Sequence, residues 1–289
     1  MPVRRGAVRP RPDARRARSP VPPDRRLTLP PVAVTGIDGA LGRRVARLLA
    51  DREVRGIDRR RGHELAEPSS YVALVRGCGA IVHTAALHPL VAPASATARD
   101  YHEANVLPFE ALLSVASRER VRRIVLVSST SVWANARPGE PARFLDESVP
   151  PDADDGYARS KRACERLVRD AAPGGVIVRL ARFARRGDPQ DAVRLLYRAI
   201  DPDDAATAVV AALDRAADGA LYAISAPTPF APADALDLGR DPRSVIRRRT
   251  GSDPSWVPGS IGGVVLADRA SRELGWRAAF PSPLYAVPT

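Results

Sequence analysis

Lysine is almost absent from this chain of 289 residues, in which Lys161 stands alone against 44 arginines. Methionine occurs only at Met1, and asparagine only at Asn105 and Asn135. A sequence that uses arginine wherever a positive charge is sufficient is expected to keep lysine where arginine cannot serve. The guanidinium group is a rigid planar fork, whereas the ammonium group is a compact point charge. Lys161, four residues after Tyr157, is therefore a candidate functional residue.

Cysteine and histidine are scarce too, and their spacing excludes several classes of site. Cys78 and Cys164 lack a Cys-x-x-Cys spacing, so we expect reduced thiols in a cytoplasmic protein. The four histidines form no paired metal-ligand motif, and we expect no metal. No apolar run approaches the roughly 20 residues that span a bilayer, so we expect no membrane segment.

Acidic residues are outnumbered, and the excess of positive charge gathers at the start of the chain. Residues 1–30 hold nine arginines and two aspartates of a chain whose net charge is +12, together with seven prolines. We expect this Arg/Pro-rich tail to be disordered. A nucleic-acid or membrane-surface arm is the functional alternative, but no hydrophobic stretch of a secretory signal follows the charges.

From residue 31 onward, short apolar runs alternate with longer amphipathic stretches. We expect strands at 32–35, 54–57, 80–83, 124–127 and 176–179, and helices near 40–50, 70–76, 99–118 and 157–171. This alternation predicts an α/β fold with a doubly wound parallel sheet. Residues 201–225 are expected to complete the sheet. Residues 183–200 and 226–289 are expected to form a small C-terminal substrate-binding cap.

Three glycines follow the first predicted strand directly and open a helix. Gly36, Gly39 and Gly42 have the spacing G-x-x-G-x-x-G. Such glycines allow a tight turn, a close approach of a pyrophosphate and the packing of helix on strand, while the helix N-terminus attracts phosphate. The pattern indicates a dinucleotide-binding domain over residues 31–182.

The end of the second predicted strand carries a charged cluster. Asp58 is placed to bind the adenosine ribose hydroxyls and to repel a 2′-phosphate, which favours NAD. Arg59, Arg60 and Arg61 follow at once, and an arginine here would accept NADP. The plain alternative is a solvated charge run at a strand end.

These features occur in the order found in one enzyme family. The ordered residues are Gly36, Gly39, Gly42, Asp58, residues 81–86, Asn105, Val106, Ser128, Ser129, Tyr157 and Lys161. The chain thus resembles extended short-chain dehydrogenases/reductases, the NAD-dependent epimerase/dehydratase family, over about residues 31–225. Residues 272–276 also look like the C-terminal helix of that family. The resemblance implies a Rossmann fold and the cofactor NAD, with NADP as the alternative.

The resemblance also implies catalytic roles. Tyr157 would be the general acid/base, and Lys161 would lower the pKa of its phenol and hold the nicotinamide ribose. Ser129 would bind and polarise the substrate oxygen, with Thr130 as the fallback. Asn105 would support the lysine through its backbone and a water molecule. Taken singly, Tyr-x-x-x-Lys is also the pattern of a surface pair one helical turn apart.

The remaining implied positions surround the cofactor and the substrate. The adenine would lie near Glu64 and Leu65, and the cofactor channel would be lined by Ala85 and Ala86. Leu41, Tyr157 and Lys161 are further expected cofactor-binding residues. Thr130 and Ser131 stand after Ser129 where a sugar dehydratase carries an Asp-Glu pair, which disfavours dehydration. Arg182 would meet an anionic substrate, with surface charge as the alternative.

The expected function is that of an NAD(P)-dependent oxidoreductase or epimerase. It would move a hydride between nicotinamide and a secondary alcohol or ketone of a sugar or sugar-nucleotide-like substrate. The competing hypothesis is a non-catalytic dinucleotide-binding regulatory or scaffold protein whose basic tail contacts nucleic acid. Family members often dimerise through two helices, here about 99–118 and 157–171. Leu112, Leu113, Val115 and Leu167 would serve that homodimer interface or the core.

Overall fold

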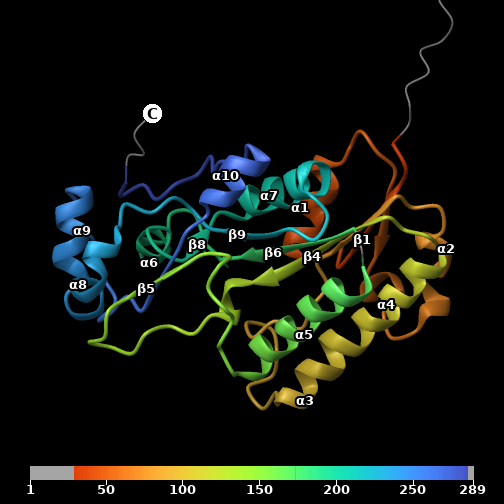
Figure 1. Ribbon diagram of the computed structural model, residues 1–289, viewed down its shortest axis with the longest axis horizontal. Coiled ribbons are helices and arrows are strands. Elements are labelled where there is room, and N and C mark those ends of the chain that lie inside the picture. Colours follow the sequence, from red (N-terminus) through yellow and green to blue (C-terminus); the bar gives the residue numbers. More distant parts are fainter. Residues whose placement is uncertain (1–28, 173, 286–289) are drawn as a thin grey trace, which may run out of the picture.

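The computed structural model describes residues 29–172 and 174–285, so nearly all of the predicted tail over residues 1–30 lies outside it. Its centre is a six-stranded parallel sheet in the order β2-β1-β3-β4-β6-β9 (Figure 1). The strands are β1 (Val32–Thr35), β2 (Val54–Ile57), β3 (Ala80–His83), β4 (Arg123–Ser129), β6 (Gly175–Leu180) and β9 (Leu221–Ile224). The doubly wound α/β fold predicted from the alternating pattern is confirmed.

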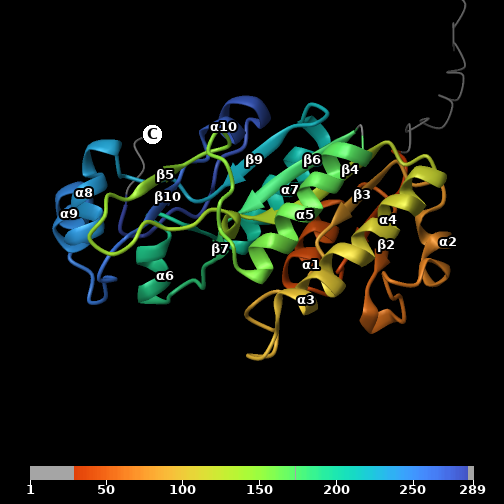
Figure 2. The ribbon, with the colours of Figure 1, turned by 60° about the horizontal axis from the view of Figure 1, so that its bottom comes forward.

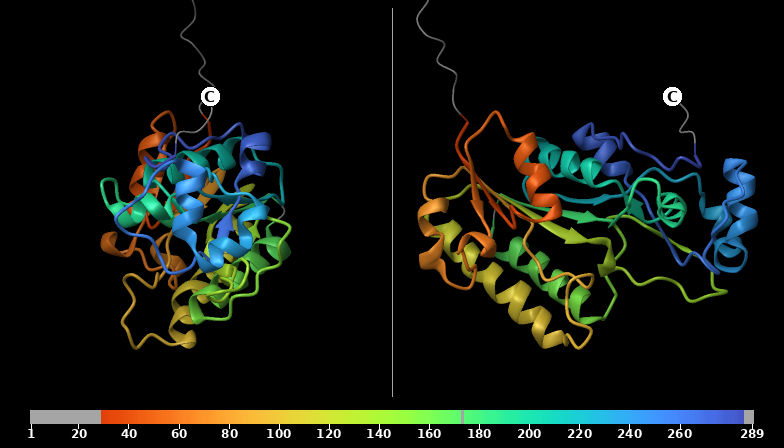
Figure 3. Two further views of the ribbon diagram at one scale, coloured as in Figure 1. Left: turned by 90° about the vertical axis from the view of Figure 1, so that its left-hand side faces the viewer. Right: turned by 180° about the vertical axis from the view of Figure 1, so that it is seen from behind.

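Helices cover both faces of this sheet, because alternate strand residues point to opposite sides. One face packs against α1 (Ala40–Leu48), α7 (Pro202–Arg215) and α10 (Asp268–Leu274); the other packs against α2 (Val72–Val75), α4 (Leu107–Arg118) and α5 (Gly156–Ala171). In β1, Val32 and Val34 join the first core and Ala33 joins the second. Figure 1 and the rear view in Figure 3 show the two layers.

The helix expected over residues 99–118 is interrupted. It consists of α3 (Ala98–Tyr101), a π-helical turn η3 (His102–Val106) and α4. Pro108 explains the break, since proline lacks the N–H that would bond to Ala104 and its ring crowds that carbonyl group. The wider turn buries Asn105 and Val106.

The leucines and valine proposed for either an interface or the core are core residues. Leu112, Leu113 and Val115 are buried in the core between the sheet and α4/α5, and Leu167 packs against it. They therefore do not form an exposed pairing surface. Homodimerisation through α4 and α5 stays a prediction.

A smaller lobe lies beyond the carboxyl ends of the strands (Figure 2). We call this lobe the cap. It contains β5 (Arg143–Leu145) paired with β10 (Gly263–Val265), β7 (Arg182–Phe183) paired with β8 (Ala199–Ile200), α6 (Pro189–Arg194), η5 (Pro232–Asp234), α8 (Ala235–Arg240) and α9 (Pro242–Thr250). Its own apolar core includes Phe230, Leu238 and Val264.

Two contacts cross the predicted division of the chain. The β5 strand lies within residues 31–182 but pairs with β10 of the cap, and α10 lies within residues 226–289 but packs on α7 and β9. The domain boundaries themselves stay a prediction. Within the described ranges, no helix has the length and apolar character needed to traverse a membrane.

Candidate active site

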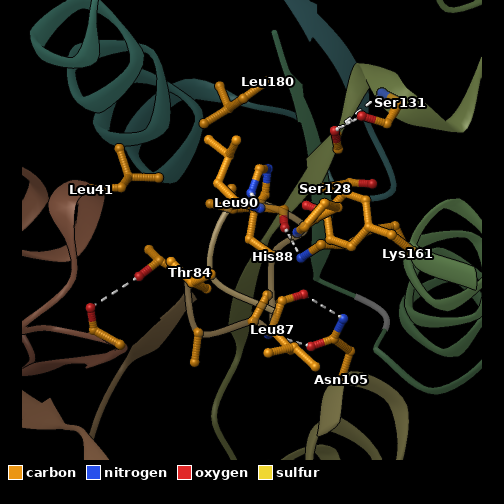
Figure 4. Close-up of a pocket in the computed structure, with 18 of the residues that line it drawn as sticks. Leu41, Thr84, Leu87, His88, Leu90, Asn105, Ser128, Ser131, Lys161 and Leu180 are labelled. Atoms are coloured by element: carbon orange, nitrogen blue, oxygen red, sulfur yellow. Dashed lines mark hydrogen bonds between the residues drawn. The ribbon is translucent and has the colours of Figure 1, made fainter. Parts of the chain in front are cut away.

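A large cleft of about 1390 Å³ lies between the sheet and the cap. It begins at the glycine turn after β1 and ends among side chains of the cap, so that both lobes contribute to its walls. Figure 4 shows the central part, with Leu41 and Thr84 on one side and Lys161 on the other. Clefts beyond the carboxyl ends of parallel strands are where α/β folds bind ligands, and this volume exceeds that of a pocket for one drug-sized molecule.

The glycine turn has room for backbone only. Gly36 has a φ of +66°, and a Cβ atom on it would lie 2.9 Å from the Cα atom of Ala85. A Cβ atom on Gly42 would lie 2.2 Å from the carbonyl oxygen of Gly36, so Gly42 serves the packing of α1 on the turn. Gly39 is the N-cap of α1, and no side chain caps that helix or places a carboxylate in its first turn. The first N–H groups of α1 therefore face the cleft without a side-chain acceptor.

Asp58, directly after β2, forms a hydrogen bond to the glycine turn. Its two carboxylate oxygens accept hydrogen bonds from the backbone N–H groups of Asp38 and Arg60, both at 3.0 Å. The Asp38 carboxylate forms a two-point pair with the Arg61 guanidinium, and this pair lowers the pKa of Asp38. Arg59 lines the cleft beside Asp58.

The loop that follows β3 is fixed to its neighbours by buried polar groups. The Asn105 side chain accepts a hydrogen bond from the Leu87 N–H at 2.6 Å and donates to the Leu87 carbonyl at 3.1 Å (Figure 4). It also donates to the Ser160 hydroxyl at 3.0 Å. Thr84 donates to the Thr35 carbonyl at 2.7 Å, which ties this loop to the end of β1. These hydrogen bonds attach residues 84–87 of the loop to β1, η3 and α5.

Tyr157 and Lys161 occupy one face of α5, one helical turn apart, and both are buried. The Lys161 ammonium donates to the Val127 carbonyl at 3.0 Å and lies 5.9 Å from the centre of the Tyr157 ring. Burial raises the pKa of Tyr157 and lowers the pKa of Lys161. Hydrogen bonding with the Ser129 hydroxyl lowers the pKa of Tyr157 and so opposes the effect of burial. Burial is thus the largest influence on the phenol, and the expected effect of Lys161 on the pKa of Tyr157 stays a prediction.

The cleft therefore combines an open helix N-terminus, an acidic residue at the end of β2 and a buried Tyr-Lys pair. Residues 32–194, more than half of the chain, match the sequence model of the NAD dependent epimerase/dehydratase family. The chain belongs to this family. The resemblance, the enzyme class and the cofactor NAD are thereby confirmed. The basic tail, on which the competing scaffold hypothesis depends, lies outside the described residues.

Similar proteins agree with this assignment at the level of fold. A short-chain dehydrogenase/reductase superfamily protein from Agrobacterium tumefaciens with bound NAD is 23% identical, has a TM-score of 0.63, and is matched over 87% of this chain and 93% of its own. The UDP-N-acetylglucosamine 4-epimerase from Bacillus cereus is 19% identical, has a TM-score of 0.64, and is matched over 89% and 96%.

A curated relative is more similar in sequence but over a shorter stretch. It is the 4-hydroxy-2-methyl-3-oxo-4-farnesyl-3,4-dihydroquinoline-1-oxide ketoreductase of Stigmatella aurantiaca, 40% identical over 103 residues. The match spans 34% of this chain and 28% of the length of that relative.

Most residues that the family resemblance pointed to are brought together in this cleft. They line it in three groups, namely Gly36, Gly39, Leu41, Asp58, Arg59, Glu64 and Leu65; Ala85, Ala86 and Asn105; and Ser129, Thr130, Tyr157, Lys161 and Arg182. Gly42 does not line it and lies behind the turn. The contacts of Asn105 are with Leu87, Ser160 and, through its carbonyl oxygen, the Cys164 thiol.

The structure adds His88, which sequence reasoning missed. Its ring packs edge-on against the Tyr157 ring, with 5.1 Å between the ring centres, and its Nδ1 atom accepts a hydrogen bond from the Leu90 N–H. Burial, with smaller contributions from Lys161 and Arg182, lowers the pKa of His88. A lone histidine in a loop has no distinguishing spacing, so the sequence carried no signal for it.

A buried ionic cluster lies behind the Tyr-Lys pair. Glu165, one turn after Lys161, forms a two-point pair with the Arg179 guanidinium at 2.7 and 2.8 Å and accepts a hydrogen bond from Ser128 at 2.7 Å. The guanidinium carbon of Arg179 lies 4.6 Å from the centre of the Trp133 ring, on which it stacks. Glu165 raises the pKa of Lys161 by its charge, against the effect of burial. This cluster fixes β4, β6 and α5 beneath the cleft.

Arg198 is the second addition, at the cap end. Its guanidinium donates to the carbonyl oxygens of Thr130 and Trp133 and to the amide oxygen of Asn135. It therefore holds the segment directly after Ser129. All these acceptors are neutral, and no carboxylate within the described residues forms an ion pair with Arg198.

Proposed function

We propose that this protein is an NAD-dependent oxidoreductase or epimerase that moves a hydride between nicotinamide and a secondary alcohol or ketone of a sugar-like substrate. The observation that carries the proposal is the convergence of Ser129, Tyr157 and Lys161 on a cleft that also contains the glycine turn and Asp58. A dinucleotide site and an acid/base pair in one cleft support hydride transfer coupled to proton transfer.

The cofactor end of the cleft fits NAD. The backbone cradle at Gly36 would be filled by any side chain, and the N-terminus of α1 offers N–H groups to a pyrophosphate. We assign Asp58 to the adenosine ribose and Glu64 and Leu65 to the adenine surroundings. When bound, NAD supplies the hydride acceptor, and the protein supplies orientation and proton transfer.

Tyr157 is proposed as the proton donor and acceptor. A phenol whose pKa is raised by burial is protonated at neutral pH, so it can donate a proton to a carbonyl oxygen as that oxygen gains charge. Ser129 would hold the same oxygen by a hydrogen bond. Lys161 provides a fixed positive charge near the phenol, which favours the phenolate when an alcohol is oxidised. Asn105 keeps the loop over this pair in place.

Two features bear on the substrate. Neighbouring folds include proteins in complex with UDP-glucose or UDP-glucuronic acid, which supports a sugar-like substrate. The ketoreductase relative, 40% identical over 103 residues, favours reduction of a cyclic ketone as the second candidate. A homodimer and a cytoplasmic location are the remaining expectations.

The test is a substrate screen that follows net NADH by absorbance at 340 nm and follows epimerisation, which leaves NADH unchanged, by chromatography of the products. Purified protein with NAD is mixed with sugars, uronates and sugar nucleotides, and with NADH it is mixed with cyclic ketones. We expect turnover with at least one class by the wild type and a loss of about 10²–10⁴-fold in Tyr157→Phe. Equal turnover by the wild type and Tyr157→Phe would contradict the role of Tyr157.

A further inference from the structure

Three guanidinium groups gather on Asp38, a residue inside the glycine turn. Its carboxylate accepts two hydrogen bonds from Arg61, both at 2.8 Å. Its carbonyl oxygen accepts hydrogen bonds from Arg43 at 2.6 Å and from Arg60 at 2.7 Å. Several guanidinium groups at one point are typical of a phosphate site. Here a carboxylate of the chain itself takes the place of a phosphate.

Asp38 also adjoins the residue that we assign to the adenosine ribose. Its backbone N–H donates a hydrogen bond to the Asp58 carboxylate at 3.0 Å. The glycine turn and the end of β2 therefore meet at these two residues. A phosphate on the 2′-hydroxyl that Asp58 binds would thus lie close to Asp38 and to the arginines that contact it.

The pairing with Asp38 turns Arg61 away from the cofactor cleft. Of the three arginines after Asp58, Arg59 and Arg60 line the cleft, whereas Arg61 lines a second hollow of about 350 Å³ together with Asp38. Hydrogen bonding with Arg61 lowers the pKa of Asp38, and hydrogen bonding with Asp38 raises the pKa of Arg61. Both groups are therefore charged and paired at neutral pH.

This ion pair is not needed to hold the turn together. The Arg61 side chain is 47% exposed and the Asp38 side chain 22%, and a pair at such a site contributes little to stability. Without the Asp38 carboxylate, the backbone N–H of residue 38 could still donate to Asp58. Loss of the carboxylate would therefore leave the turn folded and release the Arg61 guanidinium on its flexible side chain.

We propose that Asp38 is a second determinant of the preference for NAD over NADP, which acts by holding Arg61 away from the 2′ position of the adenosine ribose. The inference rests on the proposed function, which assigns Asp58 to that ribose. Asp58 repels a 2′-phosphate by its own charge, whereas Asp38 withholds a cation that would attract one. A released guanidinium would bind the phosphate through paired hydrogen bonds.

The test is fluorescence titration of the full chain with NADH and with NADPH, read as the ratio of Kd(NADPH) to Kd(NADH). In Asp38→Ala we expect this ratio to fall about fivefold, the scale of one exposed ion pair, while the Kd for NADH changes less than threefold. Arg61→Gln alone should not lower the ratio. In Asp38→Ala/Arg61→Gln the fall should be lost, because the released cation is absent. Arg59 is the same in every variant, so its effect on either cofactor is constant.

Arg47→Gln is the matched control. Arg47 is exposed and lines the same hollow, but the guanidinium groups on Asp38 are those of Arg43, Arg60 and Arg61. The ratio in this variant should equal that of the wild type. Asp38→Asn, which keeps the shape of the side chain, repeats the measurement if Asp38→Ala binds NADH poorly.

An unchanged ratio in the Asp38 variants would overturn the inference. A fall that persists in the double variant would overturn it too, because the effect would then not depend on Arg61. Failure of the wild type to bind NADH would instead overturn the proposed function, and this inference with it.

Discussion

Lys161 donates a hydrogen bond from its ammonium group to the backbone carbonyl of Val127, 3.0 Å away. This contact fixes the charge of a buried lysine at the carboxyl end of β4, where Ser128 and Ser129 follow in the same strand. The cation is therefore positioned by the sheet and not by a carboxylate. An arginine cannot reproduce this arrangement, since its fork is longer and planar.

Replacement of Lys161 should therefore lower activity strongly whichever residue is used. We expect Lys161→Arg and Lys161→Met each to lower kcat/KM by about 10²-fold or more, because general acid/base catalysis contributes on that scale. Arg166→Lys, on the exposed face of the same helix, is the control. Steady-state kinetics checks this, and retention of activity in Lys161→Arg would show that any positive charge suffices.

Asp58 should determine the choice between NAD and NADP. Asp58→Asn keeps one oxygen acceptor for the backbone but removes the negative charge that repels a 2′-phosphate. We expect the ratio of Kd(NADP) to Kd(NAD) to fall about tenfold, as about 1.4 kcal/mol of repulsion is lost. Fluorescence titration with NADH and NADPH measures both constants. An unchanged ratio, as expected for the exposed control Asp51→Asn, would remove Asp58 from cofactor selection.

Stability should fall in mild acid because of His83. Burial, with a smaller contribution from Lys161, lowers the pKa of His83 from 6.5 to about 3, so between these values the unfolded chain binds a proton that the folded chain does not. The free energy of unfolding should lose about 1.4 kcal/mol per pH unit as pH falls below 6.5. Urea unfolding at pH 7, 6 and 5 measures this loss. The slope of the free energy of unfolding against pH should be smaller in His83→Asn and unchanged in His102→Asn. Equal slopes in the wild type and both variants would refute the role given to His83.

The buried ionic cluster predicts a non-additive pair of substitutions. Arg179→Met should destabilise the protein by about 3–5 kcal/mol, because Glu165 would remain as a buried charge without its partner. The double variant Glu165→Leu/Arg179→Met should recover much of that loss. Arg169→Met, which removes a half-exposed partner of Glu165 at 3.6 Å, should change stability by less than about 1 kcal/mol. Additive losses in urea unfolding would contradict this account of the cluster.

Local patterns in the sequence were sufficient for the sheet and for the cofactor end of the cleft. The apolar runs predict the strands because buried parallel strands are apolar on both faces. The glycine spacing predicts the turn because Gly36 needs a positive φ and Gly42 touches backbone. Tyr157 and Lys161 are close in the chain, so helix geometry alone places them on one face.

The substrate end depends on contacts between distant segments, which no local pattern reveals. Arg198 contacts Thr130 and Trp133, 68 and 65 residues earlier in the chain. In a sequence with 44 arginines, nothing distinguishes Arg198 or Arg179 from those on the surface. The raised pKa of Tyr157 was also beyond prediction, because the depth of its burial follows from the loop that carries His88.

The measurement that tests the central claim most directly is calorimetric titration of NAD into the wild type and Tyr157→Phe. We predict that both proteins bind one NAD per chain with Kd values within threefold of each other, because the phenol oxygen serves proton transfer and the glycine turn holds the cofactor. Absence of NAD binding by the folded wild type would contradict the account at its base.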